Sequence, residues 1–172
     1  MRNAESEDEK SGGSAAPPPG PHPGLPSRGR LIGVDVGTVR VGLAVCDVDR
    51  KIASPLGTYT RRSAALDAAH YARVAAAEAA VGFVVGLPIS LNGTEGPKAA
   101  ECRRFGERLR ATTGLPVVFW DERFTTAYAE DALWDAGLTH KKRRGRRDRV
   151  AAQFILQAYL DAGCPAAESS GG

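Results

Sequence analysis

One acidic residue interrupts an apolar run near the start of the chain, and its type and position could support metal chemistry. Asp35 lies within residues 31–47, LIGVDVGTVRVGLAVCD, and precedes a turn that contains Gly37 and Thr38. An ionised carboxylate in apolar surroundings needs compensation, which a divalent cation can supply. Asp35 is therefore the first candidate metal ligand. The alternative is a turn residue whose carboxylate accepts hydrogen bonds from the backbone N–H groups of Gly37 and Thr38.

Three further carboxylates occur at the ends of predicted elements. Asp121 and Glu122 follow the apolar run 116–120, and Asp148 precedes an amphipathic segment. Neighbouring strand residues point to opposite faces, so at most one of Asp121 and Glu122 faces a common site, and the periodicity does not choose between them. Asp148 could instead serve only as a charge that stabilises a helix N-terminus.

Together these carboxylates suit phosphodiester hydrolysis. The reaction needs an activated water, a stabilised leaving oxygen and neutralised charge at phosphorus, and two metal ions about 3.5–4 Å apart supply all three. Asp and Glu offer the hard oxygen ligands that Mg²⁺ and Mn²⁺ prefer. We therefore expect a two-metal site in which Asp35 bridges the ions, with Asp148 and one member of the Asp121–Glu122 pair beside it.

A strongly basic segment surrounds Asp148. Residues 140–149 contain seven Lys or Arg side chains and one Asp, whereas the whole chain has a formal net charge of only +3. Such a run suits the phosphate backbone of a nucleic acid, although a solvated loop is the alternative. We predict a basic loop that binds substrate backbone through six side chains, Lys141, Lys142, Arg143, Arg144, Arg146 and Arg147.

Composition describes one soluble domain of 172 residues, of which 42% are hydrophobic and 25% charged. No apolar run approaches the ~20 residues that cross a bilayer, and no signal peptide is present, so we expect a cytoplasmic protein without a membrane partner. The three cysteines lack close Cys or His neighbours, which predicts free thiols. Residues 1–29 are rich in Pro, Gly and Ser and are expected to be a disordered tail, residues 30–161 the folded domain, and residues 162–172 a frayed end.

The elements that must position the carboxylates follow from apolar patterning and turn residues. Five strands and four helices are predicted, with the basic loop before the last helix. The strands cover 31–36, 41–47, 52–60, 83–87 and 116–120, and the helices cover 63–80, 97–113, about 125–137 and 148–161. This order suits an α/β fold with one mixed five-stranded sheet, helices on both faces and a site at the carboxyl ends of the strands.

Four ordered motifs resemble one family. They are VDVGT at 34–38, VGLP at 85–88 with NGT at 92–94, DERFTT at 121–126, and Asp148 ahead of two alanines. This set resembles the YqgF family, Holliday-junction-resolvase-like proteins associated with nuclease processing of precursor 16S ribosomal RNA. The resemblance implies a ribonuclease H-like domain, nucleic acid as partner, and Asp35, Glu122 and Asp148 as catalytic metal ligands, with Glu122 favoured over Asp121.

Four residues near these motifs are further candidates for substrate binding, and two have a structural alternative. Gly37 and Thr38 lie in the turn after Asp35. Asn92 could bind substrate, but Asn-Gly is first of all a turn pair. Arg123 could hold a phosphate or form a structural salt bridge.

Other classes of function remain open. The motif at 34–38 also resembles the first phosphate loop of actin-like ATPases, but those proteins need two such domains and a second glycine-rich loop. A catalytically silent RNA-binding module would keep the basic run without needing every carboxylate. Within nucleases, a resolvase of DNA junctions would call for a symmetric dimer. The sequence is compatible with a monomer or a homodimer.

Overall fold

The computed structural model describes residues 24–125 and 140–165, with the side chains of residues 140–149 left out of the description. Its elements confirm the predicted order of strands and helices. They are β1 (Arg30–Val36), β2 (Arg40–Cys46), β3 (Ala53–Thr60), α1 (Ala64–Ala77), β4 (Ala80–Leu87), α2 (Pro97–Thr113), β5 (Val117–Asp121), the short 3₁₀ helix η1 (Glu122–Phe124) and α4 (His140–Asp161). The helix predicted over about 125–137 lies almost entirely outside the described residues.

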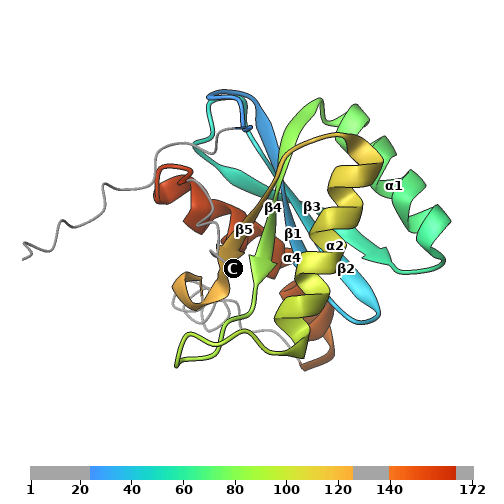
Figure 1. Ribbon diagram of the computed structural model, residues 1–172, viewed down its shortest axis with the longest axis vertical. Helices are drawn as coiled ribbons and strands as arrows, with labels where there is room; N and C mark the ends of the chain where they lie inside the picture. Colours follow the sequence, from blue (N-terminus) through green and yellow to red (C-terminus); the bar gives the residue numbers. More distant parts are fainter. Residues whose placement is uncertain (1–23, 126–139, 166–172) are drawn as a thin grey trace, which may run out of the picture.

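The five strands form one mixed sheet in the order β3-β2-β1-β4-β5 (Figure 1). The first three strands make an antiparallel meander, whereas β4 runs parallel to β1 and β5 runs parallel to β4. Strand β1 therefore lies at the centre of the sheet. Because β1, β4 and β5 point the same way, their carboxyl ends meet at one edge of the sheet, where residues that follow each strand can form a site.

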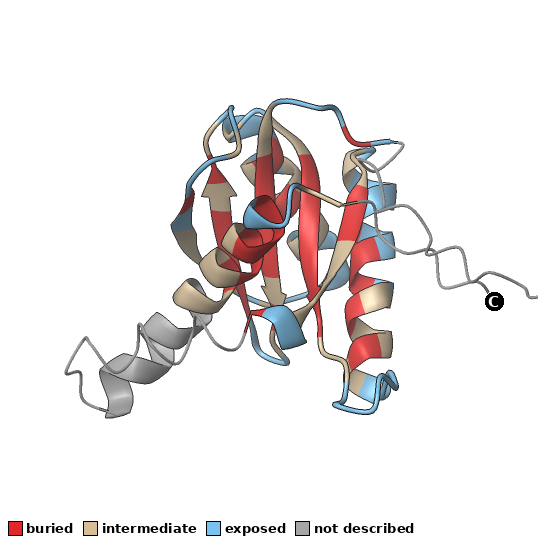
Figure 2. Cartoon of the chain, turned by 90° about the vertical axis from the view of Figure 1, so that its left-hand side faces the viewer, coloured by how far each residue is buried: buried red, intermediate tan, exposed pale blue. Residues whose placement is uncertain are grey.

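Helices cover both faces of the sheet, with α1 and α2 on one side and α4 on the other (Figures 1 and 2). Successive side chains of β1 point to opposite faces of the sheet, so this strand contributes to the hydrophobic core on each face. Ile32, Val34 and Val36 pack toward α1 and α2, while Leu31 packs toward α4. Strands buried on both faces show a nearly continuous apolar sequence, which is the pattern that made β1 and β4 predictable.

Helix α4 approaches the sheet closely and is hydrogen-bonded to its edge strand. A Cβ atom at Gly33 of β1 would lie 2.7 Å from the Leu156 Cβ and 2.8 Å from the Ala152 carbonyl oxygen, so only glycine allows this distance. The Gln157 side chain accepts a hydrogen bond from the Ala53 N–H (2.8 Å), and the Gln153 amide donates to the Ala53 carbonyl (3.0 Å). These contacts fix α4 across β1, β2 and β3.

Two boundaries differ from the prediction. The basic segment is not a loop, because α4 begins at His140 and its backbone is helical through Lys141–Arg147. Lys and Arg have high helix propensity, and the single Gly145 costs only about 1 kcal/mol, which the packed part of the helix can offset. At the other end, residues 24–29 belong to the folded unit rather than to a tail, since Leu25 is buried and the Gly29 N–H donates to the Val48 carbonyl.

The structure confirms the prediction of free thiols: Cys46 and Cys102 are buried, Cys164 is half-buried and none is in a disulfide. No helix within the described ranges combines the length and apolar character that a bilayer crossing requires.

Candidate active site

Two of the predicted carboxylates meet at the carboxyl edge of the parallel strands. Asp35 is the penultimate residue of β1, where it pairs with Gly42 of β2, and Glu122 directly follows β5. Asp35 is thus a strand residue rather than a turn residue. Burial raises the pKa of Glu122 to about 7, and the Asp35 carboxylate is the next largest cause of that shift. The two acids are therefore close enough to repel each other.

A glycine makes room for this pair. Gly86 lies near the end of β4, between β1 and β5, and pairs with Trp120. A Cβ atom at Gly86 would lie 2.5 Å from Glu122 Oε1 and 2.5 Å from Ile155 Cδ1 of α4. The Glu122 carboxylate therefore lies over the backbone of β4, on the face that α4 covers. Gly86 belongs to the VGLP motif at 85–88, but its sequence context did not indicate that it makes room for Glu122.

The choice between Asp121 and Glu122 has a local cause. Strand β5 ends at Asp121, and its carboxylate accepts hydrogen bonds from the Arg123 N–H (3.0 Å) and from Arg123 Nη2 (2.6 Å). This closed pair caps the 3₁₀ turn at 122–124, so the strand alternation no longer applies at Glu122. Arg123 thus forms the structural salt bridge that was the alternative to phosphate binding, and its substrate role stays a prediction.

Lys98, which was not among the predicted site residues, lies near the carboxylates. Lys98, in the first turn of α2, opposes the upward pKa shift of Glu122, and its Nζ lies 3.2 Å from Glu101 Oε2. The same group of charges acts on the thiol of Cys102, whose pKa rises to about 11 mainly through burial. Lys98 follows Pro97 at the start of a helix, and this helix comes directly after the loop that follows β4. Its position near the carboxyl end of a strand was the sequence signal that could have marked it as a site residue.

The turn after Asp35 is confirmed as a tight hairpin. A Cβ atom at Gly37 would lie 2.2 Å from the Arg40 carbonyl oxygen, so no larger residue fits. The Gly37 carbonyl accepts a hydrogen bond from Arg61 Nη1 (3.0 Å), while Thr38 is exposed. Both residues lie beside the carboxylate pair, and their contact with substrate stays a prediction.

The loop that contains Asn92 is confirmed as a turn. Asn92 Oδ1 accepts hydrogen bonds from the Thr94 N–H (3.1 Å) and from Thr94 Oγ1 (2.7 Å), and Gly93 has a φ of 83°. The amide oxygen of Asn92 therefore organises its own loop. Substrate binding by Asn92 stays a prediction.

The third predicted carboxylate, Asp148, lies in α4, one helical turn before Ala152. Ala152 in turn lies against Gly33 of β1, two residues before Asp35. The side chains of Asp148 and of the basic residues Lys141, Lys142, Arg143, Arg144, Arg146 and Arg147 lie outside the described part of the structure. Their placement at the site stays a prediction.

The donor chemistry at this edge fits a hard divalent cation. Asp35 and Glu122 contribute carboxylate oxygens, and their mutual repulsion would be relieved by positive charge between them. Among the side chains that the structure describes, no group of three or more His, Cys, Asp or Glu residues is placed to hold a metal ion. A third protein carboxylate would have to come from outside the described side chains, and the predicted one is Asp148 of α4.

Known proteins resemble this chain in sequence and in fold. A family model named RuvX and described as a Holliday junction resolvase matches residues 29–162. Proteins named "Putative pre-16S rRNA nuclease" are 46% identical over 137 residues in Rhodobacter capsulatus (80% of this chain, 86% of the relative) and 44% identical over 139 residues in Rhodopirellula baltica (81% and 80%).

Among solved structures, Thermus thermophilus RuvC in complex with a Holliday junction superposes with a TM-score of 0.54 at 16% identity, over 80% of this chain and 98% of RuvC. This likeness concerns the fold, and it confirms the ribonuclease H-like class predicted from the sequence. Since the family model covers most of the residues and the relatives match over four fifths of the chain, the chain belongs to the RuvX family of nucleases, also called YqgF.

Proposed function

We propose that this protein is a metal-dependent nuclease that acts in the cytoplasm on precursor 16S ribosomal RNA. The observation that carries the proposal is the meeting of Asp35 and Glu122 over Gly86, at the carboxyl ends of parallel strands. The names of the relatives support the RNA substrate. The proposal includes Asp148 as the third acidic ligand.

The carboxylates would hold Mg²⁺ or Mn²⁺, which activates a water molecule and neutralises charge on the scissile phosphate when bound. Asp35 would contribute from the central strand, Glu122 from the start of η1 and Asp148 from α4. Glu122 must lose its proton to become a ligand, because only the carboxylate form binds a cation well. The nearby Lys98 favours that form, since its charge lowers the pKa of Glu122.

The amino-terminal turns of α4 would bind the RNA backbone in this proposal. The segment is helical and carries the six predicted contacts between Lys141 and Arg147. Phosphate contacts of this kind position a strand without reading its sequence. Gly37, Thr38, Asn92 and Arg123 would contact the strand near the carboxylates.

A second candidate is resolution of four-way DNA junctions, which the description of the family model and the fold shared with RuvC favour. Paired cuts in a junction would need a symmetric dimer, whereas cleavage of RNA would not. Both a monomer and a homodimer are compatible with RNA cleavage.

The test uses the full chain with Mg²⁺ or Mn²⁺ on precursor 16S ribosomal RNA and on a four-way DNA junction, side by side. Asp35→Asn is the matched control, because it removes ligand charge at nearly constant shape. We expect metal-dependent cleavage of the RNA that is lost in Asp35→Asn and with chelator. Cleavage of the junction alone would favour the resolvase. Binding of RNA without cleavage under any condition would favour the RNA-binding module.

A further inference from the structure

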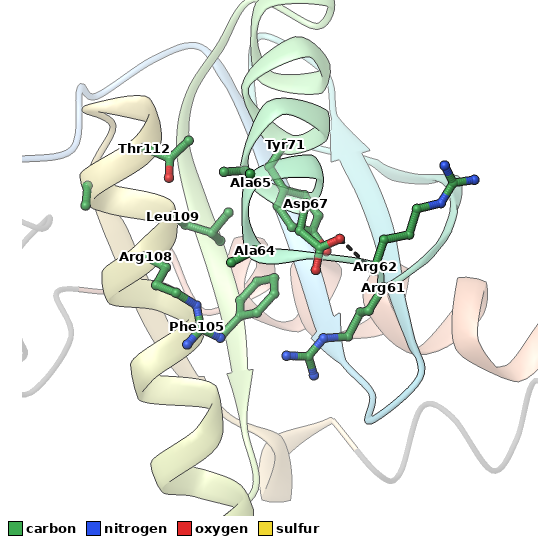
Figure 3. Close-up of a pocket in the computed structure, with 12 residues that line it drawn as sticks. Arg61, Arg62, Ala64, Ala65, Asp67, Tyr71, Phe105, Arg108, Leu109 and Thr112 are labelled. Atoms are coloured by element: carbon green, nitrogen blue, oxygen red, sulfur yellow. Dashed lines mark hydrogen bonds between the residues drawn. The ribbon is translucent and has the colours of Figure 1, made fainter.

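A cavity lies on the face of the sheet opposite the candidate active site. It has a volume of about 560 Å³, lies between α1 and α2, and is separate from Asp35 and Glu122 on the α4 face (Figure 3). This volume falls within the range of small-molecule sites. The apolar wall comes mainly from Phe105 and Leu109 of α2 and from the alanines of α1.

The cavity carries positive charge at its opening. Arg61, Arg62 and Arg108 line it together with a single acid, Asp67. Figure 3 shows the Arg61 and Arg108 side chains on either side of the Phe105 ring. Within the described residues, the Arg108 guanidinium makes no ion pair, whereas Asp67 already accepts hydrogen bonds from Tyr59 and from the Arg62 backbone. Arg61 is paired with Glu101, so Arg62 and Arg108 against Asp67 leave a small net positive charge at the cavity.

Tyr71 lines the same cavity, and its hydroxyl is buried beneath the cavity surface. Tyr71 is only 3% exposed, and its hydroxyl has no hydrogen-bond partner among the described residues. An unsatisfied buried hydroxyl is destabilising, and buried polar groups in folded proteins usually have a hydrogen-bond partner. Burial raises the pKa of Tyr71, and Asp67 raises it further, so the phenol keeps its proton at neutral pH and can donate a hydrogen bond.

One wall of the cavity reaches the predicted active edge. Arg61 Nη1 donates to the Gly37 carbonyl (3.0 Å) and to Glu101 (2.8 Å), and Gly37 is two residues beyond Asp35. The first turn of α1 also borders the cavity through Ala64 and Ala65, and a helix N-terminus favours an anion. An anion bound at Arg61 would therefore lie near the hairpin that contains Gly37, on the opposite face of the sheet from the Asp35 and Glu122 carboxylates.

We propose that this cavity binds a nucleoside phosphate, with the phosphate at Arg61 and Arg108, the base against the apolar wall and a polar group of the ligand at the Tyr71 hydroxyl, which a side-chain movement on binding would expose. A nucleoside phosphate combines the three features that the cavity offers: a dianionic end, a flat body with apolar faces, and hydrogen-bonding edges. The ligand is either a free nucleotide or one nucleotide unit of a bound RNA strand. The proposal does not depend on nuclease activity, because binding is measured without metal.

The test is titration calorimetry of the full chain with 5′-AMP in the presence of EDTA, compared with adenosine and with inorganic phosphate. We expect saturable binding of AMP and affinity for each fragment that is weaker by about tenfold or more, since a charge-assisted pair and apolar burial each contribute. Arg108→Ala should weaken AMP binding about tenfold. Arg104→Ala, which removes an exposed arginine of the same helix outside the cavity, should leave it unchanged.

Tyr71→Phe gives a second readout that does not rely on charge. The variant should bind AMP more weakly and, without ligand, should unfold at a higher temperature than the parent, because the unsatisfied hydroxyl is gone. Absence of saturable AMP binding by the parent, or equal AMP affinity of the parent and Arg108→Ala, would overturn the proposal.

A short oligoadenylate RNA distinguishes the two sources of the ligand. If Arg108→Ala weakens the binding of both AMP and the RNA, the cavity holds a nucleotide unit of the strand. If the variant weakens only AMP binding, the cavity takes a free nucleotide. Either result supports a nucleoside phosphate site.

Discussion

The two faces of the sheet create space in different ways. On the α4 face, Gly33 lets helix α4 approach the backbone of the sheet, and Gly86 lets the Glu122 carboxylate do so. The candidate active site therefore depends on two positions at which a residue larger than glycine would not fit. On the opposite face, large residues such as Tyr71 and Phe105 fill the core, and the cavity lies between α1 and α2. The acidic site is thus set by the sheet, whereas the basic cavity is set by the packing of two helices.

The largest effect on cleavage is expected from Asp35→Asn, which alters the candidate active site and leaves the cavity unchanged. Asp35→Asn should lower metal-dependent cleavage by on the order of 100-fold or more, because it removes one of the charges that hold the cation. Its circular dichroism spectrum and its affinity for 5′-AMP should match those of the parent, since the cavity lies on the other face. Full cleavage by the variant would remove Asp35 from the active site.

The neighbouring acids offer a matched pair. Glu122→Gln should reduce cleavage by on the order of 100-fold, whereas Asp121→Asn should have a much smaller effect, because Asp121 is paired with Arg123. Steady-state cleavage of one RNA by both variants gives the ranking. A reversed ranking would mean that the second ligand is Asp121.

Gly86→Ala tests whether the missing side chain is the functional feature. The added methyl would lie 2.5 Å from Glu122 Oε1, so we expect about a tenfold loss of cleavage and about 1–3 kcal/mol of destabilisation through overpacking. Gly57→Ala on β3 is the control, because its methyl would meet no atom within 4 Å. Equal cleavage by the two variants would contradict the role of Gly86. Urea unfolding supplies the stability values.

A salt titration compares the two cationic surfaces. If about four residues of the basic segment contact a single strand, the logarithm of RNA affinity should fall with the logarithm of salt at a slope near −3. Alanine at Lys141, Lys142, Arg143 and Arg144 together should flatten this slope strongly, while Arg108→Ala should change it by about 0.7 at most. An unchanged slope in the fourfold variant would exclude the amino-terminal part of α4 from the RNA path.

A further prediction concerns the pH dependence of stability without metal. The pKa of Glu122 is raised from 4.5 to about 7 in the folded state, so the folded protein binds this proton more tightly than the unfolded chain does. The free energy of unfolding should therefore decrease as pH rises from 4.5 to 7 and then level off, by about 3 kcal/mol at most. Carboxyl NMR should give a lower Glu122 pKa in Asp35→Asn. An unshifted pKa would mean that the two acids are not in contact.

The strands of the sheet were easier to predict from the sequence than the orientation of Glu122 and the start of α4. Strands β1 and β4 were predictable because burial on both faces demands apolar runs, and the acidic ends of strands marked the edge of the site. Glu122 could be preferred over Asp121 only by resemblance, because alternation ends where β5 turns into η1. The start of α4 was missed, since its charges resemble those of a loop while its stability comes from packing further along the helix.

The cavity could not have been predicted in the same way. Tyr71 and Phe105 occupy helical core positions, and no sequence pattern tells whether two neighbouring helices will close over them. Leu25 was missed for a related reason, because one apolar residue among prolines and glycines gives no periodicity. Both features depend on distances between elements rather than on the order of residues within one element.

The glutamines of α4 also bear on how the molecule avoids aggregation. Strand β3 lies at an edge of the sheet, and an edge with free N–H and C=O groups can recruit a strand from another chain. At Ala53 both groups are already occupied, by Gln157 and Gln153, and a third amide contact joins Gln157 to the Lys51 carbonyl. Two side-chain amides thus take the place of a sixth strand at this end, so the helix that carries Asp148 also protects the sheet from templated growth.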